Sequence, residues 1–436
     1  MLDRWFHLSE RGTTVRIEAI AGLTTFMTMA YIIFANPSIL SQMPDLGTPE
    51  AKAALTAATC LAAAVPTLVM GLYANYPFAL ASGMGLNALL VTVVVSRGLP
   101  WQVGMGIIVA EGIVITVLVV AGLREVVMDA IPLALKQAIS VGIGLLIALL
   151  GLKQAQIIGV VQTGGGDWVL VPGDVATPEV LLAAFGLIVT AVLMTGRVRG
   201  AILLGIVATA IVGAAAGKVK APTQVVGVPN LELFGQADLV GALDVALIGT
   251  IFAFLITDFF DTMGTVIGVG GEGGFLDGQG RLPRLRRVLL VDSLAAAWGG
   301  LCGASSATTY IESAAGVAVG GRTGLTSVVV GVLFVLAAFF APLAGVVPSF
   351  ATAPALVVVG LLLMAVVREI DFKQVGDALP AFLVIIIIPL TMSISHGIGY
   401  GFIMYTVIRV LTGRYREVHP LMYAVSILFA AAFALG

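Results

Sequence analysis

Residues 304–321 read ASSATTYIESAAGVAVGG, and this stretch decides how the rest of the chain is interpreted. It is long and apolar enough to cross a bilayer, yet Glu312 stands in its middle. The Ser and Thr residues before Glu312 favour extended chain, and the small residues after it can start a helix, so the pattern predicts a half-strand that leads into a half-helix. Such irregular backbone is tolerated at membrane depth only where it is buried in protein or lines a cavity. Broken helices of this kind form the substrate sites of many secondary transporters.

Composition indicates a membrane protein of the all-α polytopic class. The 436 residues are 59% apolar and only 11% charged. Apolar runs of about 20 residues recur along the whole length, and each is long enough to span a hydrocarbon core. This pattern excludes a sizeable soluble domain. Cys60 and Cys302 both lie inside apolar runs, so no disulfide framework is implied.

The apolar runs divide into fourteen predicted transmembrane segments, seven in each half. The predicted segments of the first half are 16–40, 53–73, 78–95, 101–122, 132–152, 178–195 and 199–217. Those of the second half are 242–268, 285–301, 304–320, 324–347, 351–368, 378–396 and 397–413. The remaining parts are an interfacial amphipathic lead at 1–15 with Trp5, Phe6 and Leu8 on one apolar side, a polar connector at 218–241, and an apolar tail at 414–436. The run 420–435 is too short for an assignment as a membrane span.

The two halves resemble each other. The motif Ser82–Asn87 in the third segment occupies the same place in its half as Thr308–Glu312 in the tenth, so both segments are predicted to contain a short extended stretch. Thr195 and Gly196 are likewise equated with Ser395 and His396, between the last two segments of each half. An odd number of spans per repeat forces the copies into opposite orientations, which is the inverted-repeat plan of secondary carriers.

Basic residues orient the chain, because cytoplasmic loops are enriched in Lys and Arg. A cytoplasmic N-terminus places most of the 22 Lys and Arg residues on the inner side. We therefore expect a multi-pass protein of the plasma (inner) membrane with its N-terminus in the cytoplasm. The glycine-rich stretch 268–274 and the arginines of 281–287 resemble a phosphate cradle only superficially, since they follow a membrane helix and lack a Lys-Ser/Thr ending. They are predicted to form a loose cytoplasmic loop.

Four polar residues from three segments are predicted to converge. Asp258 and Asp261 are three residues apart in the eighth segment and share a helix face. Glu312 of the tenth segment and Asn87 of the third would be brought to them by the repeat symmetry. Acids at membrane depth are functional by default. Asp261 either takes part directly or positions Asp258, and the alternative for Asn87 is an ordinary interhelical hydrogen bond.

Other residues at membrane depth have weaker signals. Glu111 and Asp292 are acids in unbroken segments, for which structural or proton-path roles are expected. Glu18 is expected to interact favourably with the N-terminal dipole of its own helix. Phe26 or Tyr31 in the first segment can stack on a planar ligand, although packing is the default role of such rings.

The broken segments contain no Lys or Arg that would neutralise a strongly anionic substrate. Carboxylates and an amide instead suit a neutral ligand that presents N–H donors beside acceptors. Buried acids also provide the proton site that a symporter needs. The expected coupling ion is H⁺, with no cofactor and no metal.

At these residues the sequence resembles the hypoxanthine/guanine/adenine permeases, the purine branch of the nucleobase/cation symporter-2 superfamily. The motifs that carry the resemblance are Met29-Ala-Tyr-Ile-Ile-Phe-Ala-Asn36-Pro37, Ala81-Ser-Gly-Met-Gly-Leu-Asn87-Ala88, Asp258-Phe-Phe-Asp261-Thr-Met-Gly264-Thr265 and Thr308-Thr-Tyr-Ile-Glu312-Ser313. The resemblance implies fourteen helices, with a core domain (16–122 and 242–347) that carries substrate against a gate domain (123–217 and 348–413). It also implies proton coupling, alternating access by an elevator-like movement, and a homodimer.

Carried over by motif, the resemblance implies that Asn87, Asp258 and Glu312 contact a purine base. Thr309 and Phe26 are expected beside them, and Asp261 in support. Asp258, Asp261 and Glu312 are the candidates for the coupled proton.

Several alternatives stay open. The same fold can carry another nucleobase, such as uracil or xanthine, or an anion, although the lack of a basic residue in the broken segments argues against an anion. An intramembrane enzyme is disfavoured because the three histidines lie near segment ends and no His-Glu-x-x-His motif is present. A channel is disfavoured because paired acids on inverted broken helices favour alternating access. No nucleic-acid partner is expected.

Overall fold

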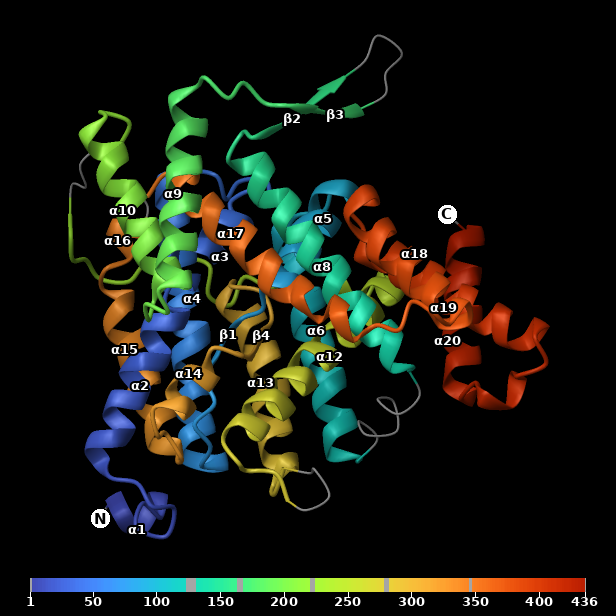
Figure 1. Ribbon diagram of the computed structural model, residues 1–436, viewed down its shortest axis with the longest axis horizontal. Helices are drawn as coiled ribbons and strands as arrows, with labels where there is room; N and C mark the ends of the chain where they lie inside the picture. The colour runs from blue at the N-terminus through green and yellow to red at the C-terminus, as the bar shows by residue number, and fades with distance from the viewer. Residues whose placement is uncertain are drawn as a thin grey trace.

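The computed structural model describes residues 2–122, 131–162, 168–219, 224–277, 282–344 and 347–435. Helices make up most of this part of the chain, and the short strands β1 and β4 lie among them (Figure 1).

Elements α1 to α10 belong to the first half of the sequence. They are α1 (Leu2–Phe6), α2 (Val15–Met29), α3 (Ile32–Leu40), α4 (Pro49–Val69), η1 (Met70–Ala74), β1 (Leu80–Ser82), α5 (Met84–Arg97), α6 (Trp101–Val120), α8 (Leu133–Gln154), β2 (Ile158–Gln162), β3 (Trp168–Pro172), α9 (Pro178–Thr195) and α10 (Ala201–Ala215). The second half contains α11 (Leu239–Ala242), η2 (Val245–Leu247), α12 (Ile248–Glu272), α13 (Leu285–Cys302), β4 (Ala307–Thr309), α14 (Ser313–Ala318), α15 (Gly324–Ala338), α16 (Ala341–Ala344), α17 (Ser349–Met364), η3 (Ala365–Glu369), α18 (Val375–Thr391), α19 (Ile394–Leu411), η4 (Tyr415–Glu417) and α20 (Pro420–Leu435).

Six helical stretches of the described ranges are long and apolar enough to cross a membrane. They are Val15–Leu40, Pro49–Ala74, Trp101–Val120, Leu133–Gln154, Pro178–Thr195 and Ser349–Glu369. Shorter apolar helices, among them α5, α10, α15 and α18, accompany them. A polytopic helical membrane protein is therefore confirmed, and the count of fourteen segments stays a prediction.

The first predicted segment is interrupted. Helix α2 ends at Met29 and α3 begins at Ile32. The Thr28 hydroxyl donates hydrogen bonds to the carbonyls of Thr24 and Thr25 just before the break. Such side-chain bonds compete with the helical ladder and bend helices. The second segment also begins earlier than predicted, at Pro49, where the Thr48 hydroxyl caps α4.

The predicted boundary between the last two segments, at 396 and 397, is wrong. Met392 adopts a left-handed conformation with φ of 54°, and the Ser393 hydroxyl caps α19 by accepting from the His396 N–H. Helix α19 therefore begins at Ile394 and His396 lies in its first turn. The equivalence with Thr195 and Gly196, which lie at the end of α9, fails for the same reason.

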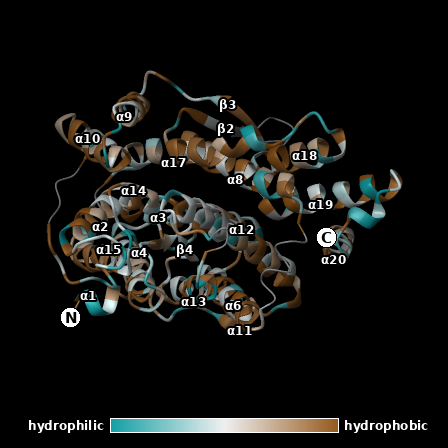
Figure 2. Cartoon of the chain, turned by 60° about the horizontal axis from the view of Figure 1, so that its bottom comes forward, coloured by the Kyte–Doolittle hydropathy of each residue, from teal (hydrophilic) through white to brown (hydrophobic). Residues whose placement is uncertain are grey.

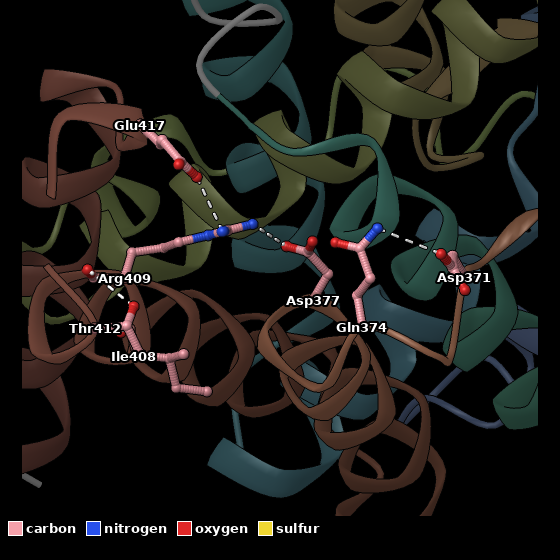
Figure 3. A network of polar contacts seen from close by, with 7 residues as sticks. All are labelled: Asp371, Gln374, Asp377, Ile408, Arg409, Thr412 and Glu417. Atoms are coloured by element: carbon pink, nitrogen blue, oxygen red, sulfur yellow. Dashed lines mark hydrogen bonds and ion pairs between the residues drawn. The ribbon is translucent and has the colours of Figure 1, made fainter. Parts of the chain in front are cut away.

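A buried arginine ties together the elements on both sides of this boundary (Figure 3). Arg409 of α19 donates to Asp377 of α18 at 2.7 Å and to Glu417 of η4 at 2.9 Å. Its guanidinium also lies 5.2 Å from the centre of the Tyr405 ring. The Asp377 and Glu417 side chains are 25% and 53% exposed, so solvent weakens both ion pairs, and the network chiefly fixes how α18, α19 and η4 meet.

The helices are arranged in two layers (Figure 2). One, here called the site layer, comprises α2–α6, α11–α15 and the β1–β4 pair. The other, the flanking layer, comprises α8–α10 and α17–α19, in which α8 packs chiefly against α17 and α18. Apart from α11, most of which lies in the predicted connector, the predicted core ranges supply the site layer and the predicted gate ranges supply the flanking layer. Their roles in moving a substrate stay predictions.

The segments outside the predicted spans differ from expectation in several ways. Phe6 and Leu8 of the lead are buried against Leu325, whereas Trp5 is 62% exposed, so the three do not share one apolar side. The unassigned run 420–435 forms helix α20, which packs on α19. Strands β2 and β3, between α8 and α9, pair antiparallel, which no pattern predicted.

The eighth segment is shifted relative to its predicted range, 242–268. Helix α12 begins at Ile248, after the short α11 and η2, and continues to Glu272. Most of the glycine-rich stretch 268–274 is therefore helical, and the predicted loose loop begins only at Gly273.

Candidate functional site

The site is built around the β1–β4 strand pair. The two strands are antiparallel, with Ala81 opposite Thr308. At the ends of the pair the Gly83 N–H donates to Ser306 at 2.8 Å, and the Tyr310 N–H donates to Ala79 at 2.9 Å. Backbone groups at membrane depth need such partners because no water is present there. The predicted half-strands before α5 and before α14 are thus confirmed, and the backbone groups of each strand form hydrogen bonds with those of the other.

Asp292 of α13 fixes β4. One of its carboxylate oxygens accepts from the Thr309 N–H at 2.9 Å and from the Thr309 hydroxyl at 2.8 Å. The other accepts from the Thr262 hydroxyl at 2.5 Å, and Thr262 also contacts the Thr308 hydroxyl at 2.9 Å. Asp292 therefore has the structural role that was one of its two predicted roles. Thr309, predicted to contact substrate, is 1% exposed with its hydroxyl directed to Asp292.

Glu312 lies at the junction between β4 and α14. Its carboxylate accepts a hydrogen bond of 2.7 Å from the Tyr31 hydroxyl, at the break between α2 and α3. Glu312 keeps part of its surface exposed, whereas Tyr31 is only 2% exposed. Tyr31 thus acts as a hydrogen-bond donor to Glu312, and its buried ring is not available to stack on a ligand.

Asp261 faces the same junction from α12. One of its carboxylate oxygens lies 3.6 Å from the position that a Cβ on Gly83 would occupy, at the end of β1. Asp261 is partly exposed and lies within electrostatic range of Glu312 and Asp292. The structure therefore brings Asp261 and Glu312 to the same place, beside the paired strands β1 and β4. We call this place the strand crossing.

Asn87 and Asp258 lie one helical turn away from this point, on α5 and α12, two helices that contact each other. Both side chains are fully buried. Among the described residues, neither the amide nitrogen nor the amide oxygen of Asn87 has a hydrogen-bond partner. An unsatisfied buried polar group costs about 1–3 kcal/mol, so Asn87 lacks the interhelical bond that was its alternative role.

Phe26, another predicted site residue, contacts an aromatic ring of the site layer. Its ring packs edge to face on Phe334 of α15, with 5.1 Å between the ring centres. Helix α2 meets α14 instead through Thr25 and Thr28, and the Thr28 hydroxyl lies 3.5 Å from the Glu312 carbonyl oxygen.

The remaining buried acids lie elsewhere. Glu111 is fully buried in α6, whose neighbour Gly112 packs closely on Ala297 of α13. Glu18 lies in the first turn of its own helix, α2, as expected. Its carboxylate accepts from the backbone N–H groups of Arg322, Thr323 and Thr326 at the start of α15. These bonds join Glu18 to the N-terminus of a second helix, α15.

Sequence reasoning did not identify Tyr31 as the partner of Glu312 or Asp292 as the acceptor that fixes β4. The signal for Tyr31 was its position in the motif that begins at Met29. For Asp292 the signal was an acid at membrane depth, but its target could be known only once α13 was placed beside β4.

The sequence matches the model of a family described as the permease family over residues 16–400. Adenine permease AdeP of Escherichia coli (strain K12) is 42% identical over 431 residues, which cover 98% of this chain and 95% of the relative. Guanine/hypoxanthine permease PbuG of Bacillus subtilis (strain 168) is 42% identical over 441 residues, which cover 99% of each chain. Among solved structures, the transmembrane domain of the cyanobacterium bicarbonate transporter BicA aligns with a TM-score of 0.60 at 16% identity. That alignment covers 85% of this chain and 96% of the other, and it shows a shared fold.

Proposed function

The chain belongs to this permease family, and on that premise we propose that it carries purine nucleobases into the cell together with a proton. It is a multi-pass membrane transporter rather than an enzyme. The observation that carries the proposal is the pair of partly exposed carboxylates, Glu312 and Asp261, at the crossing of β1 and β4. Both relatives described above are named for purine bases.

The chemistry of these side chains suits a purine. A carboxylate at Glu312 or Asp258 accepts two neighbouring N–H groups of a base, and ionised acceptors make the stronger hydrogen bonds. The Asn87 amide offers both a donor and an acceptor, and within the described residues both are unused. A bound base that satisfies them recovers the free energy lost by burying the amide. Thr309 acts in this scheme by holding β4 through Asp292.

The proton is assigned to the same group of acids. Glu312 and Asp261 lie close enough for the charge on one to disfavour charge on the other. A shared proton relieves this repulsion and leaves one carboxylate to accept from the base. The Tyr31 hydroxyl donates to Glu312 and keeps its carboxylate directed toward the strand crossing.

The movement follows from the two layers. All the site residues named above belong to the site layer. Helix α5 of this layer packs on α8 of the flanking layer, where Gly85 lies against Ile143. We propose that the site layer moves as a unit against the flanking layer and exposes the strand crossing to each side of the membrane in turn. We also propose a homodimer, and a cytoplasmic N-terminus because that orientation places most of the Lys and Arg residues on the inner side.

Two other classes of substrate, another nucleobase and an anion, remain alternatives within this scheme. Uracil or xanthine would use the same acceptors, and competition with each base distinguishes them. An anion is the second alternative, because the chain shares its fold with a bicarbonate transporter. The carboxylates at the strand crossing would repel an anion. If the chain carries an anion, its uptake should therefore not depend on Glu312.

The test is uptake of radiolabelled hypoxanthine, guanine, adenine and uracil into proteoliposomes with an imposed inward proton gradient. We expect gradient-driven purine uptake by the wild type and its loss in Glu312→Gln, which removes the charge and keeps the size. Glu50→Gln, an exposed acid in the first turn of α4, serves as the matched control and should transport normally. Robust uptake by Glu312→Gln would remove this residue from the mechanism, and bicarbonate uptake without purine uptake would favour the anion carrier.

A further inference from the structure

A cavity lies at the end of the site layer that carries the N-terminus. It has a volume of about 290 Å³. Its lining comes from four separate parts of the chain: the lead before α2, the link between η1 and β1, the link between α12 and α13, and the link between α14 and α15. Its lining residues are Arg11, Tyr76, Gly273, Gly274, Phe275, Pro283, Arg284 and Arg322.

Three guanidinium groups meet in this cavity. Arg11 and Arg284 both lie against the Tyr76 ring, at 5.5 Å and 5.8 Å from its centre. Arg11 also donates to the backbone carbonyl of Arg322 at 2.9 Å, which holds the three residues together. Burial, and to a smaller extent the neighbouring Arg284, lower the pKa of Arg11 below its ordinary value.

Among the described residues, most of the donors on these side chains have no partner. A guanidinium has five N–H donors. Arg11 and Arg322 each bond to backbone carbonyls through one nitrogen, Nη1. Within the described residues, Arg284 makes no side-chain hydrogen bond, and no ion pair includes any of the three.

The described acids within electrostatic range of Arg11 are Glu18 and Glu10, and Glu10 contacts the His7 ring at 3.2 Å. Glu18 lies next to Arg322 in space, but its carboxylate accepts from backbone groups at the start of α15 and from the Thr326 hydroxyl. The aromatic ring of Tyr76 compensates the positive charges only in part, since a cation–π contact is worth about 0.5–2 kcal/mol. Three cations with free donors around one cavity are therefore suited to a compact, multiply charged anion.

We propose that this cavity binds a phosphate-bearing anion through Arg11, Arg284 and Arg322. Planar guanidinium groups match phosphate oxygens with paired hydrogen bonds. An adjoining cavity of about 430 Å³ shares Arg284 and adds Arg286 and Arg287 beside the apolar side chains of Val119, Val120 and Leu290. A phosphate headgroup of a lipid and a free phosphate both fit this chemistry. The site is separate from the proposed substrate site and does not depend on the proposed function.

Binding is measured on the purified full-length chain as the rise in thermal unfolding temperature. One arm uses inorganic phosphate against chloride at equal ionic strength. The other arm uses mixed micelles with phosphatidylglycerol against phosphatidylcholine. We expect a rise in at least one arm, and an apparent affinity about tenfold weaker in Arg284→Gln and in Arg322→Gln, since each loses a charge-assisted hydrogen bond. Arg414→Gln, an exposed arginine outside both cavities, should bind like the wild type.

A rise with inorganic phosphate assigns the site to a soluble phosphate, and a rise with phosphatidylglycerol alone assigns it to the membrane. The proposal is overturned if neither anion raises the unfolding temperature beyond its control, or if both variants keep wild-type affinity. Should Arg322→Gln fail to fold because its guanidinium also bonds to Val317 and Gly321, Arg284→Gln decides the outcome alone.

Discussion

At the scale of single residues, the strand crossing depends on polar side chains that hold the backbone and on others that are left for a ligand. Asp292 belongs to the first kind, because its two oxygens accept from Thr262 and twice from Thr309. Glu312 and Asp261 belong to the second kind, because each keeps part of its surface exposed. This division separates an acid that stabilises the fold from the two acids that we propose to serve transport.

Asp292→Ala should therefore lower stability strongly. The substitution leaves the Thr309 N–H and two hydroxyl groups buried without their acceptor, and we expect a loss of about 3 kcal/mol or more. The measurement is thermal unfolding of the purified protein. Asp371→Ala is the control, since Asp371 is exposed and bonds only within its own turn. An unchanged unfolding temperature in Asp292→Ala would show that β4 holds its position without this carboxylate.

At the scale of elements, the helices of the site layer are joined by bonds from one helix to the end of another. Glu18 of α2 is the clearest case. It is fully buried, and its carboxylate accepts from the N–H groups of Thr323 and Thr326 and from the Thr326 hydroxyl, at 3.3, 3.2 and 2.6 Å. The N-terminal N–H groups of a helix have no partner within the helix, so Glu18 provides the cap that α15 needs and attaches it to α2.

Glu18→Ala should destabilise the packing of α15 on α2. We expect a loss of about 2 kcal/mol or more, because a cap is worth about 1 kcal/mol and this one is charged and buried. Glu18→Gln, which keeps one acceptor, should lose less. Glu50→Ala, at an exposed position in the first turn of α4, should change stability by only a few tenths of a kcal/mol. Equal unfolding temperatures for Glu18→Ala and Glu50→Ala would contradict the cap.

At the scale of the whole molecule, the two layers contact each other at a few close points. At one of these, a Cβ placed on Gly85 of α5 would lie 3.9 Å from the Cβ of Ile143 of α8. This separation is within the range of Cβ atoms joined by a disulfide. The native cysteines, Cys60 and Cys302, are both buried and do not compete for the pairing.

Gly85→Cys combined with Ile143→Cys should stop transport on oxidation, because the disulfide joins the layers that we propose to move. Reduction should restore uptake. The control is Gly142→Cys with Ile388→Cys, where a Cβ on Gly142 lies 3.3 Å from that of Ile388 and both helices belong to the flanking layer. Uptake is measured in proteoliposomes, with the cross-link verified by mass spectrometry. Normal uptake by the oxidised interlayer pair would refute movement of the layers at this contact.

Much of this protein could be predicted from the sequence. Composition determined the membrane class, because long apolar runs with few charges have no other stable environment. Ser and Thr residues before Glu312 determined that the tenth segment is broken, because they favour extended backbone over helix. The correspondence between the two halves placed the second extended stretch in the third segment, whereas the break in the first segment, between Met29 and Ile32, was not predicted.

The tertiary structure alone decided which side chains meet. Tyr31 and Glu312 are 281 positions apart, and Glu18 and Thr326 are 308 apart. The tertiary structure also located some helix ends, such as the boundary at Met392 and Ser393. A cap that involves a left-handed residue leaves little trace in hydrophobic periodicity. Local composition records the preferences of each segment, but the partners of a carboxylate or of three arginines are set by how distant segments pack.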